Sequence, residues 1–113
     1  MKKTDKKIEN AIVGSLTEVC DIALKGIDGF EWITHFVNYS NVPQSLSVVC
    51  IFDTKESLLN VVKSRKDEEL RQLIRQKLST VDIHIKDVQK QVSFDTEEAC
   101  QNVNGGNWDE RFR

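Results

Sequence analysis

Two similar pentapeptides carry the acidic residues that are best placed to do chemistry. Phe52–Glu56 and Phe94–Glu98 both read Phe-Asp-Thr, then a charged residue, then glutamate. If each pentapeptide joins a strand to a helix, Asp53 and Asp95 lie at the carboxyl ends of neighbouring strands, where open α/β sheets bind ligands. Two carboxylates at such an edge could hold Mg²⁺ and support phosphoester hydrolysis.

The same motif also has a purely structural explanation. An aspartate just before a helix accepts a hydrogen bond from a free N–H of the first turn, and a glutamate three residues later can return one. Asp53 with Glu56, and Asp95 with Glu98, have this spacing. We therefore expect both aspartates to cap helices and no cofactor to be required, with the metal site as the alternative.

The histidines and cysteines add no complete catalytic or metal motif. His35 and His84 are isolated, and no Cys-x-x-Cys pair occurs. Cys20 and Cys50 fall on apolar faces of expected elements and should lie in the core. Cys100 follows an expected helix start and is the most favourable cysteine for reactivity. The motifs therefore favour a protein that is not an enzyme.

The strands that position the aspartates are organised around residues 46–53. This nearly continuous apolar run predicts a strand covered on both faces, at the centre of a sheet. Residues 30–39 alternate as a second strand, joined antiparallel to the first through a loop that contains Pro43. Residues 92–94 predict a third strand, parallel to the central one. One face of the second strand is more apolar than the other and should face the core. It carries Phe30, Trp32, Thr34 and Phe36.

Helices are expected on either side of these strands. Apolar residues recur at helical spacing from Ile8 to Ala23, which predicts a long helix with Thr4 or Asp5 as its cap and Gly26 as its left-handed stop. Apolar residues also recur at helical spacing after Asp53, which predicts a short helix there. The remaining elements are a helix over 67–78, a loop with a short extended piece over 81–91, and a short helix that breaks at Gly105 and Gly106.

Together these elements predict one α/β (α+β) domain over residues 1–113. Its small mixed three-stranded sheet carries helices packed on it in the order α-β-β-α-α-β-(α), and residues 101–113 form a tail docked on the body. The chain has 113 residues, 39% hydrophobic and 30% charged, with a formal net charge of −2. This balance is typical of a globular domain and gives no bulk attraction to nucleic acid.

The chain has no apolar run of about 20 residues, so the sequence predicts a cytoplasmic protein without membrane contact. Its C-terminal aromatic and basic residues are the candidates for binding a protein partner: Trp108, Arg111 and Phe112. An exposed edge at residues 30–39 could instead pair with a second copy in a homodimer. A separate basic set could contact nucleic acid, with Trp32 and Phe36 as a stacking platform: Lys63, Arg65, Lys66, Arg71 and Arg75.

Four segments resemble a known family: Asn38–Tyr39, Ser45–Thr54, Val92–Cys100 and Trp108–Phe112. Together they are similar to small uncharacterised bacterial proteins that are sometimes catalogued as Fis-type transcriptional regulators. The resemblance covers most of the chain and brings no known active site, so it adds no site residue. The regulator description implies a C-terminal helix-turn-helix, and Asn104–Asn107 departs from that pattern.

The sequence therefore predicts a cytosolic, non-enzymatic binding or regulatory module that acts through a protein partner or through its own dimer. Two alternatives stay open. One is a nucleic-acid-binding regulator that uses the basic set. The other is a metal-dependent phosphoester hydrolase that uses Asp53 and Asp95.

Overall fold

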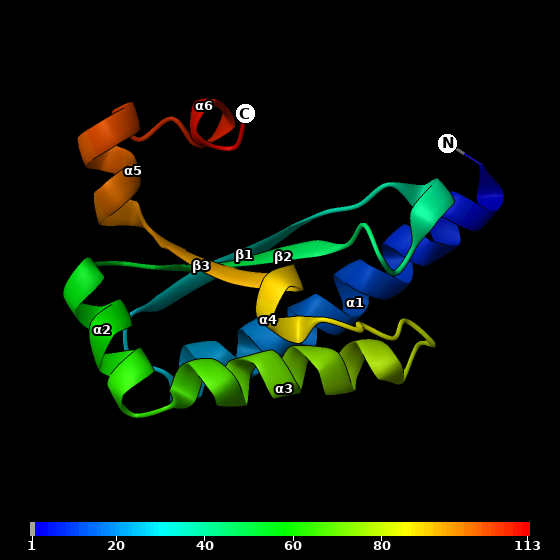
Figure 1. Ribbon diagram of the computed structural model, residues 1–113, viewed down its shortest axis with the longest axis horizontal. Coiled ribbons are helices and arrows are strands. Elements are labelled where there is room, and N and C mark those ends of the chain that lie inside the picture. Colours follow the sequence, from blue (N-terminus) through cyan, green and yellow to red (C-terminus); the bar gives the residue numbers. More distant parts are fainter. Residues whose placement is uncertain (1) are drawn as a thin grey trace.

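The computed structural model describes residues 2–113 and contains one three-stranded sheet with helices on both of its faces (Figure 1). The predicted α+β class, the mixed sheet and the order of elements are confirmed. The elements, in chain order, are α1 (Lys3–Gly26), β1 (Phe30–Phe36), the 3-10 turn η1 (Tyr39–Asn41), β2 (Ser47–Phe52), α2 (Lys55–Lys63), α3 (Lys66–Ser79), α4 (Val88–Gln91), β3 (Val92–Thr96), α5 (Glu97–Asn104) and α6 (Trp108–Arg111).

Strand β2 is the centre of the sheet, as its continuous apolar sequence predicts. It pairs antiparallel with β1 and parallel with β3, where Val48 lies opposite Val92 and Phe52 opposite Thr96. All of β2 except Ser47 is buried. Strands β1 and β3 are therefore the two edges of the sheet.

Two long helices cover one face of the sheet, which we name the inner face. Helices α1 and α3 pack side by side beneath it, while α5 and α6 stand on the opposite, outer face (Figure 1). The inner layer is apolar because both helices turn one stripe towards the sheet. Its fully buried members include Ile12, Val19, Val48, Phe52, Ile74, Leu78 and Val92.

A β-bulge in β1 divides its side chains between the two faces. Phe30 pairs with Phe52, but Trp32 pairs with Ile51, so Glu31 is an extra residue on this strand. An extra residue reverses the alternation beyond it. Phe30 therefore lies in the inner core, and the prediction that Trp32, Thr34 and Phe36 share that face is wrong: these three residues lie on the outer face.

The ends of α1 also differ from the prediction. Lys2 occupies the N-cap position without a side-chain hydrogen bond, so Thr4 and Asp5 lie inside the first turn. Gly26 is the last helical residue, and the chain leaves through Ile27 in an extended conformation. The expected left-handed stop is therefore wrong here, although one does occur later, at Gly105 (φ 60°) after α5.

The connection before β3 is partly as expected. Helix α3 carries Asp67 in its first turn, as predicted. The chain then runs as a loop that buries Ile83 and Ile85 against the core. No strand forms in residues 81–91, and the end of this range is the short helix α4, which the sequence did not indicate. The side chain of Asp87 caps α4 by accepting a hydrogen bond from the Lys90 N–H.

Candidate functional site

The two strand-to-helix junctions are capped by threonines. Thr54 Oγ1 accepts from the Ser57 N–H at 3.1 Å, and Thr96 Oγ1 accepts from the Ala99 N–H at 3.0 Å. The prediction that Asp53 and Asp95 are the caps is therefore wrong by one residue. Threonine serves as well, because its hydroxyl reaches the same first-turn N–H groups.

The junctions lie side by side, as the parallel pairing predicts, and Glu98 joins them. Its N–H donates to the carbonyl of Asp53 at 3.0 Å, and its Oε1 accepts from the Lys55 N–H at 2.7 Å. Glu98 thus satisfies a free donor of the neighbouring helix α2. A carboxylate at this position also interacts favourably with the positive end of α2.

Asp53 and Asp95 have separate partners. A hydrogen bond from the Ser57 hydroxyl, with others at Thr54, outweighs partial burial and lowers the pKa of Asp53. Burial opposes ionisation of Asp95, yet the hydrogen bonds from Arg111 and Thr96 lower its pKa overall. Within residues 2–113, no three His, Cys, Asp or Glu side chains gather into a possible metal cluster. Asp53 accepts from the Thr54 N–H, whereas Asp95 accepts from the Thr96 N–H and from Arg111.

The C-terminal residues predicted to bind a partner contact the outer face of the sheet. Trp108 stacks edge-on against Trp32, with ring centroids 5.1 Å apart, and Phe112 does the same with Phe36. Glu97 accepts from both indoles, at 2.6 Å from Trp32 Nε1 and 3.4 Å from Trp108 Nε1. We call this group of residues the C-terminal cluster: Trp32, Phe36, Asp95, Glu97, Trp108, Arg111 and Phe112.

Arg111 fixes the position of α6 within this cluster. Its guanidinium donates twice to Asp95, at 2.7 Å and 2.9 Å, and once to Asn104 Oδ1 at 3.0 Å. A paired geometry of this kind is among the stronger side-chain interactions in proteins. The bond to Asp95 raises the pKa of Arg111 above its usual range.

The basic residues of the nucleic-acid alternative are spread over several environments. Lys63 and Arg65 are exposed at the turn between α2 and α3, where the Lys66 ammonium lies 3.5 Å from the Gly26 carbonyl. Arg75 is exposed on α3. Arg71 is half-buried, and four structural contacts occupy it: ion pairs with Asp67 and Glu68, a hydrogen bond to the Val92 carbonyl at 3.4 Å, and the ring of Phe94 at 4.7 Å.

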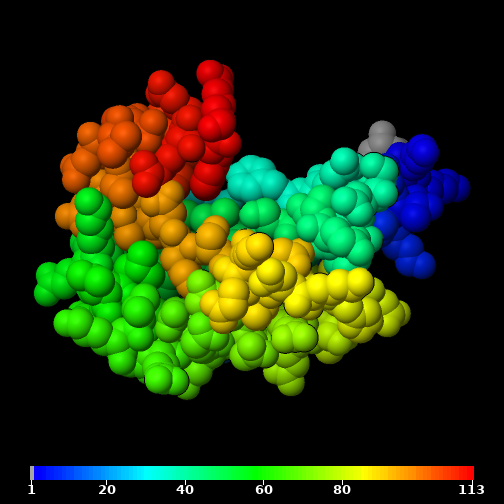
Figure 2. Space-filling model, in the orientation of Figure 1, coloured from blue at the N-terminus to red at the C-terminus, as the bar shows by residue number. Residues whose placement is uncertain are grey.

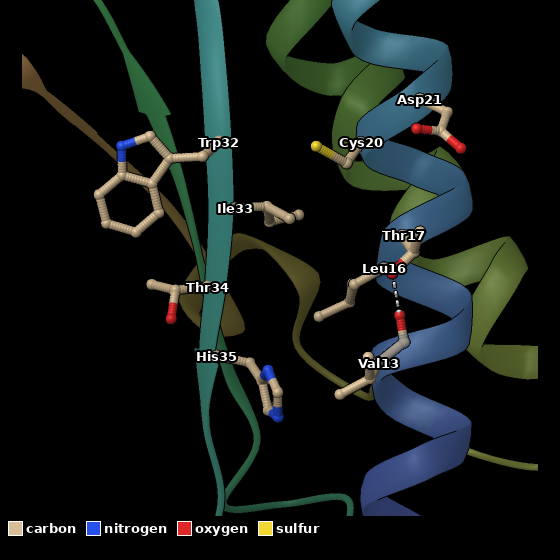
Figure 3. A pocket seen from close by; sticks show the side chains of 9 residues that line it. All are labelled: Val13, Leu16, Thr17, Cys20, Asp21, Trp32, Ile33, Thr34 and His35. Carbon is tan, nitrogen blue, oxygen red and sulfur yellow. Dashed lines mark hydrogen bonds between the residues drawn. The ribbon is translucent and has the colours of Figure 1, made fainter.

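A groove lies between α1 and β1. Its volume is about 390 Å³, and its lining is mainly apolar (Figure 3). From α1 it is lined by Val13, Leu16, Thr17, Cys20 and Asp21, and from β1 by Trp32, Ile33, Thr34 and His35. This volume falls within the range of ligand pockets.

Four consecutive residues of β1 line this groove, which shows that one of its walls is the backbone edge of the strand. Ile33 and His35 point towards α1, while Trp32 and Thr34 point away from it (Figure 3). All four line the groove, so it follows the edge of the strand itself. Among residues 2–113, the backbone of residues 31–36 forms no hydrogen bond to any element other than β2. The groove therefore exposes unpaired N–H and C=O groups beside an apolar floor.

His35, which lines the groove, belongs to a hydrogen-bonded trio with Glu9 and Tyr39. Glu9 on α1 contacts His35 Nε2 at 2.9 Å through one carboxylate oxygen and accepts from the Tyr39 hydroxyl through the other. The hydrogen bond to Glu9, followed by partial burial and the carboxylate charge, raises the pKa of Tyr39 to about 12. These bonds tie the end of β1 and the turn η1 to the helix that forms the opposite wall.

The sequence did not single out the groove residues on α1. Val13 is 46% exposed, and two other apolar residues of α1, Ile22 and Leu24, are exposed as well. Cys20, expected in the core, is half-buried and lines the groove, whereas Cys100, expected to be the most reactive, is fully buried. Because only Val13 of these three lines the groove, the sequence carried no signal specific to the groove.

Comparisons with protein-family models, with curated proteins and with solved structures found no match to this chain. No helix among residues 2–113 combines the length and the apolar character that crossing a membrane requires.

Proposed function

We propose that this protein is a non-enzymatic binding module that captures an extended segment of a partner protein as an added strand along β1. The observation that carries the proposal is the run of four edge residues, Trp32–His35, lining an apolar groove against α1. The edge would supply main-chain hydrogen bonds, and the groove would accept side chains that alternate along the bound segment.

The lining defines the chemistry of the segment. Leu16, Cys20 and Ile33 project into the groove (Figure 3) and would pack against an apolar side chain. Asp21 is the one carboxylate in the lining, and no other residue of the described chain forms an ion pair with it. We therefore expect a segment that combines apolar residues with a lysine or arginine placed to reach Asp21.

We also propose that the protein is cytoplasmic. Cys20, Cys50 and Cys100 are all free thiols, which supports a reducing compartment. A regulatory role would follow if the captured segment belongs to a protein whose activity depends on that segment being free.

A display library of random peptides of about six residues tests the proposal with a defined probe. The full-length chain should enrich apolar peptides that carry a basic residue. Val13→Lys should abolish that enrichment, because the lysine side chain would occupy the groove. Val103→Lys is the matched control, since Val103 is an exposed apolar helical residue outside the groove. Failure to enrich any peptide, or equal enrichment by both variants, would contradict the proposal.

The mode of binding is tested by methylating backbone nitrogens of an enriched peptide. In strand addition, every second N–H group of the peptide points towards β1. Methylating those nitrogens should abolish binding, whereas methylating the nitrogens between them should leave binding nearly unchanged. Equal tolerance of both registers would exclude strand addition. A wild-type dimer that Val13→Lys converts to a monomer would instead identify a second copy of this chain as the occupant.

A further inference from the structure

We infer that the C-terminal turn Trp108–Phe112 is a clamp that orders the binding edge of β1, so that its docking and occupancy of the groove are coupled. The inference concerns regulation of the groove and rests on the function proposed above. It depends on one geometric fact: the residues that form the groove edge on one side carry the C-terminal cluster on the other.

The contacts alternate along β1. Trp32 and Phe36 face outward and meet Trp108 and Phe112, at ring-centroid distances of 5.1 Å in both pairs. Ile33, between them in sequence, faces α1 and lines the groove (Figure 3). The bulge at Glu31 creates this division, because without it Trp32 would point inward. The clamp therefore backs the same few residues whose backbone would bind the peptide.

Side-chain hydrogen bonds to Trp108 and Arg111 hold the clamp against the sheet and α5. Arg111 bonds Asp95 and Asn104, while Glu97 bonds the indoles of Trp32 and Trp108. Helix α6 itself spans only Trp108–Arg111 and follows Gly105 and Gly106, both at positive φ. A helix of one turn is not stable alone, so these contacts determine whether it docks.

Edge strands without a second neighbour open easily, and a peptide binds only the ordered edge. Docking of α6 should therefore raise the affinity of the groove, and a bound peptide should in turn favour docking by the same factor. Figure 2 shows α6 covering one part of the outer face beside a hollow, so release of the turn would expose the backing of β1 to solvent.

The test is hydrogen exchange on full-length Arg111→Ala, with Arg113→Ala as the matched control. Arg113 is exposed and makes no side-chain bond within the described residues. We expect backbone amides of residues 32–36 to exchange about tenfold faster in Arg111→Ala, while those of β2 stay unchanged. Trp108→Ala should have the same effect, since it removes the ring that packs on Trp32.

The outcomes separate the two proposals. If the amides of α6 lose protection and those of residues 32–36 do not, the turn docks passively and the clamp is excluded, whether or not peptides bind. If β1 amides respond but no library peptide is enriched, the clamp stands and the strand-addition function fails. If peptides bind wild type and Arg111→Ala equally, the coupling is excluded.

Discussion

The guanidinium of Arg111 meets the carboxylate of Asp95 through two hydrogen bonds, Nε to Oδ2 at 2.7 Å and Nη2 to Oδ1 at 2.9 Å. Each side chain is about a fifth exposed, at 22% and 21%. This pair joins the last helical turn to an edge strand of the sheet. It also makes both carboxylate oxygens of Asp95 acceptors for the same guanidinium.

Asp95→Asn should destabilise the fold by about 1 to 2 kcal/mol near neutral pH. The pKa of Asp95 is lowered in the folded chain, so its contribution is complete above the unfolded value of about 3.9 and is lost as the pH falls through the folded value. Urea unfolding between about pH 2 and pH 6 should show the gap from wild type closing at acid pH. Asp109→Asn, at an exposed residue of α6, should show no such dependence.

Thr96→Ala should cost about 1 kcal/mol or somewhat more, because it removes the cap of α5 at a site only 2% exposed. Thr96→Ser keeps the hydroxyl and should recover most of the loss. Thermal or urea unfolding measures both. Equal stability of the alanine and serine variants would show that the hydroxyl does not cap the helix.

Tyr39 is the one tyrosine of the chain, so its ionisation can be followed directly by phenolate absorbance. Its pKa should be about 12 in the wild type, because the bond to the Glu9 carboxylate requires a protonated phenol. That bond is present at neutral pH and is lost as the pH rises from about 10 through the folded value.

Glu9→Gln should return the pKa of Tyr39 towards about 10. Glu18→Gln serves as a control, because Glu18 lies on the same helix and pairs with Lys77. A wild-type titration at the ordinary value would remove Glu9 as the partner of Tyr39.

Cys20 should be the first cysteine to react with iodoacetamide in the folded protein. Burial and the charge of Asp21 raise the pKa of its thiol, which slows the reaction, but Cys20 is accessible from the groove. Cys50 and Cys100 are fully buried, and burial raises the pKa of Cys50 to about 12. Peptide mapping at increasing urea should show these two labelled only on unfolding. Early labelling of Cys100 would contradict its placement.

The sheet could be predicted from the sequence because its signals are local. The continuous apolar run of β2 can be satisfied only by cover on both faces, and the repeated Phe-Asp-Thr motif marks two parallel junctions. The ion pair of Arg71 with Asp67 also follows from helical spacing. These features need no knowledge of what lies elsewhere in the chain.

The groove could not be predicted because it depends on how distant elements meet. Val13 and Ile33 belong to different elements and line one surface only after α1 packs beside β1. The sequence also could not show that Thr54 and Thr96, and not the adjacent aspartates, are the N-caps of α2 and α5. Both residue types cap helices well. The separate partners of Asp53 and Asp95 depend on the fold in the same way.

Glu31 carries a consequence for how the chain can evolve or be engineered. Only Phe30 of β1 precedes it, and the register shift reverses the faces that Trp32–Phe36 would otherwise occupy. Deleting Glu31 would alter none of the other side chains. It would nevertheless turn the indole of Trp32 towards the inner core and the side chain of Ile33 towards the outer face. One residue therefore sets which face of the sheet each side chain of Trp32–Phe36 occupies.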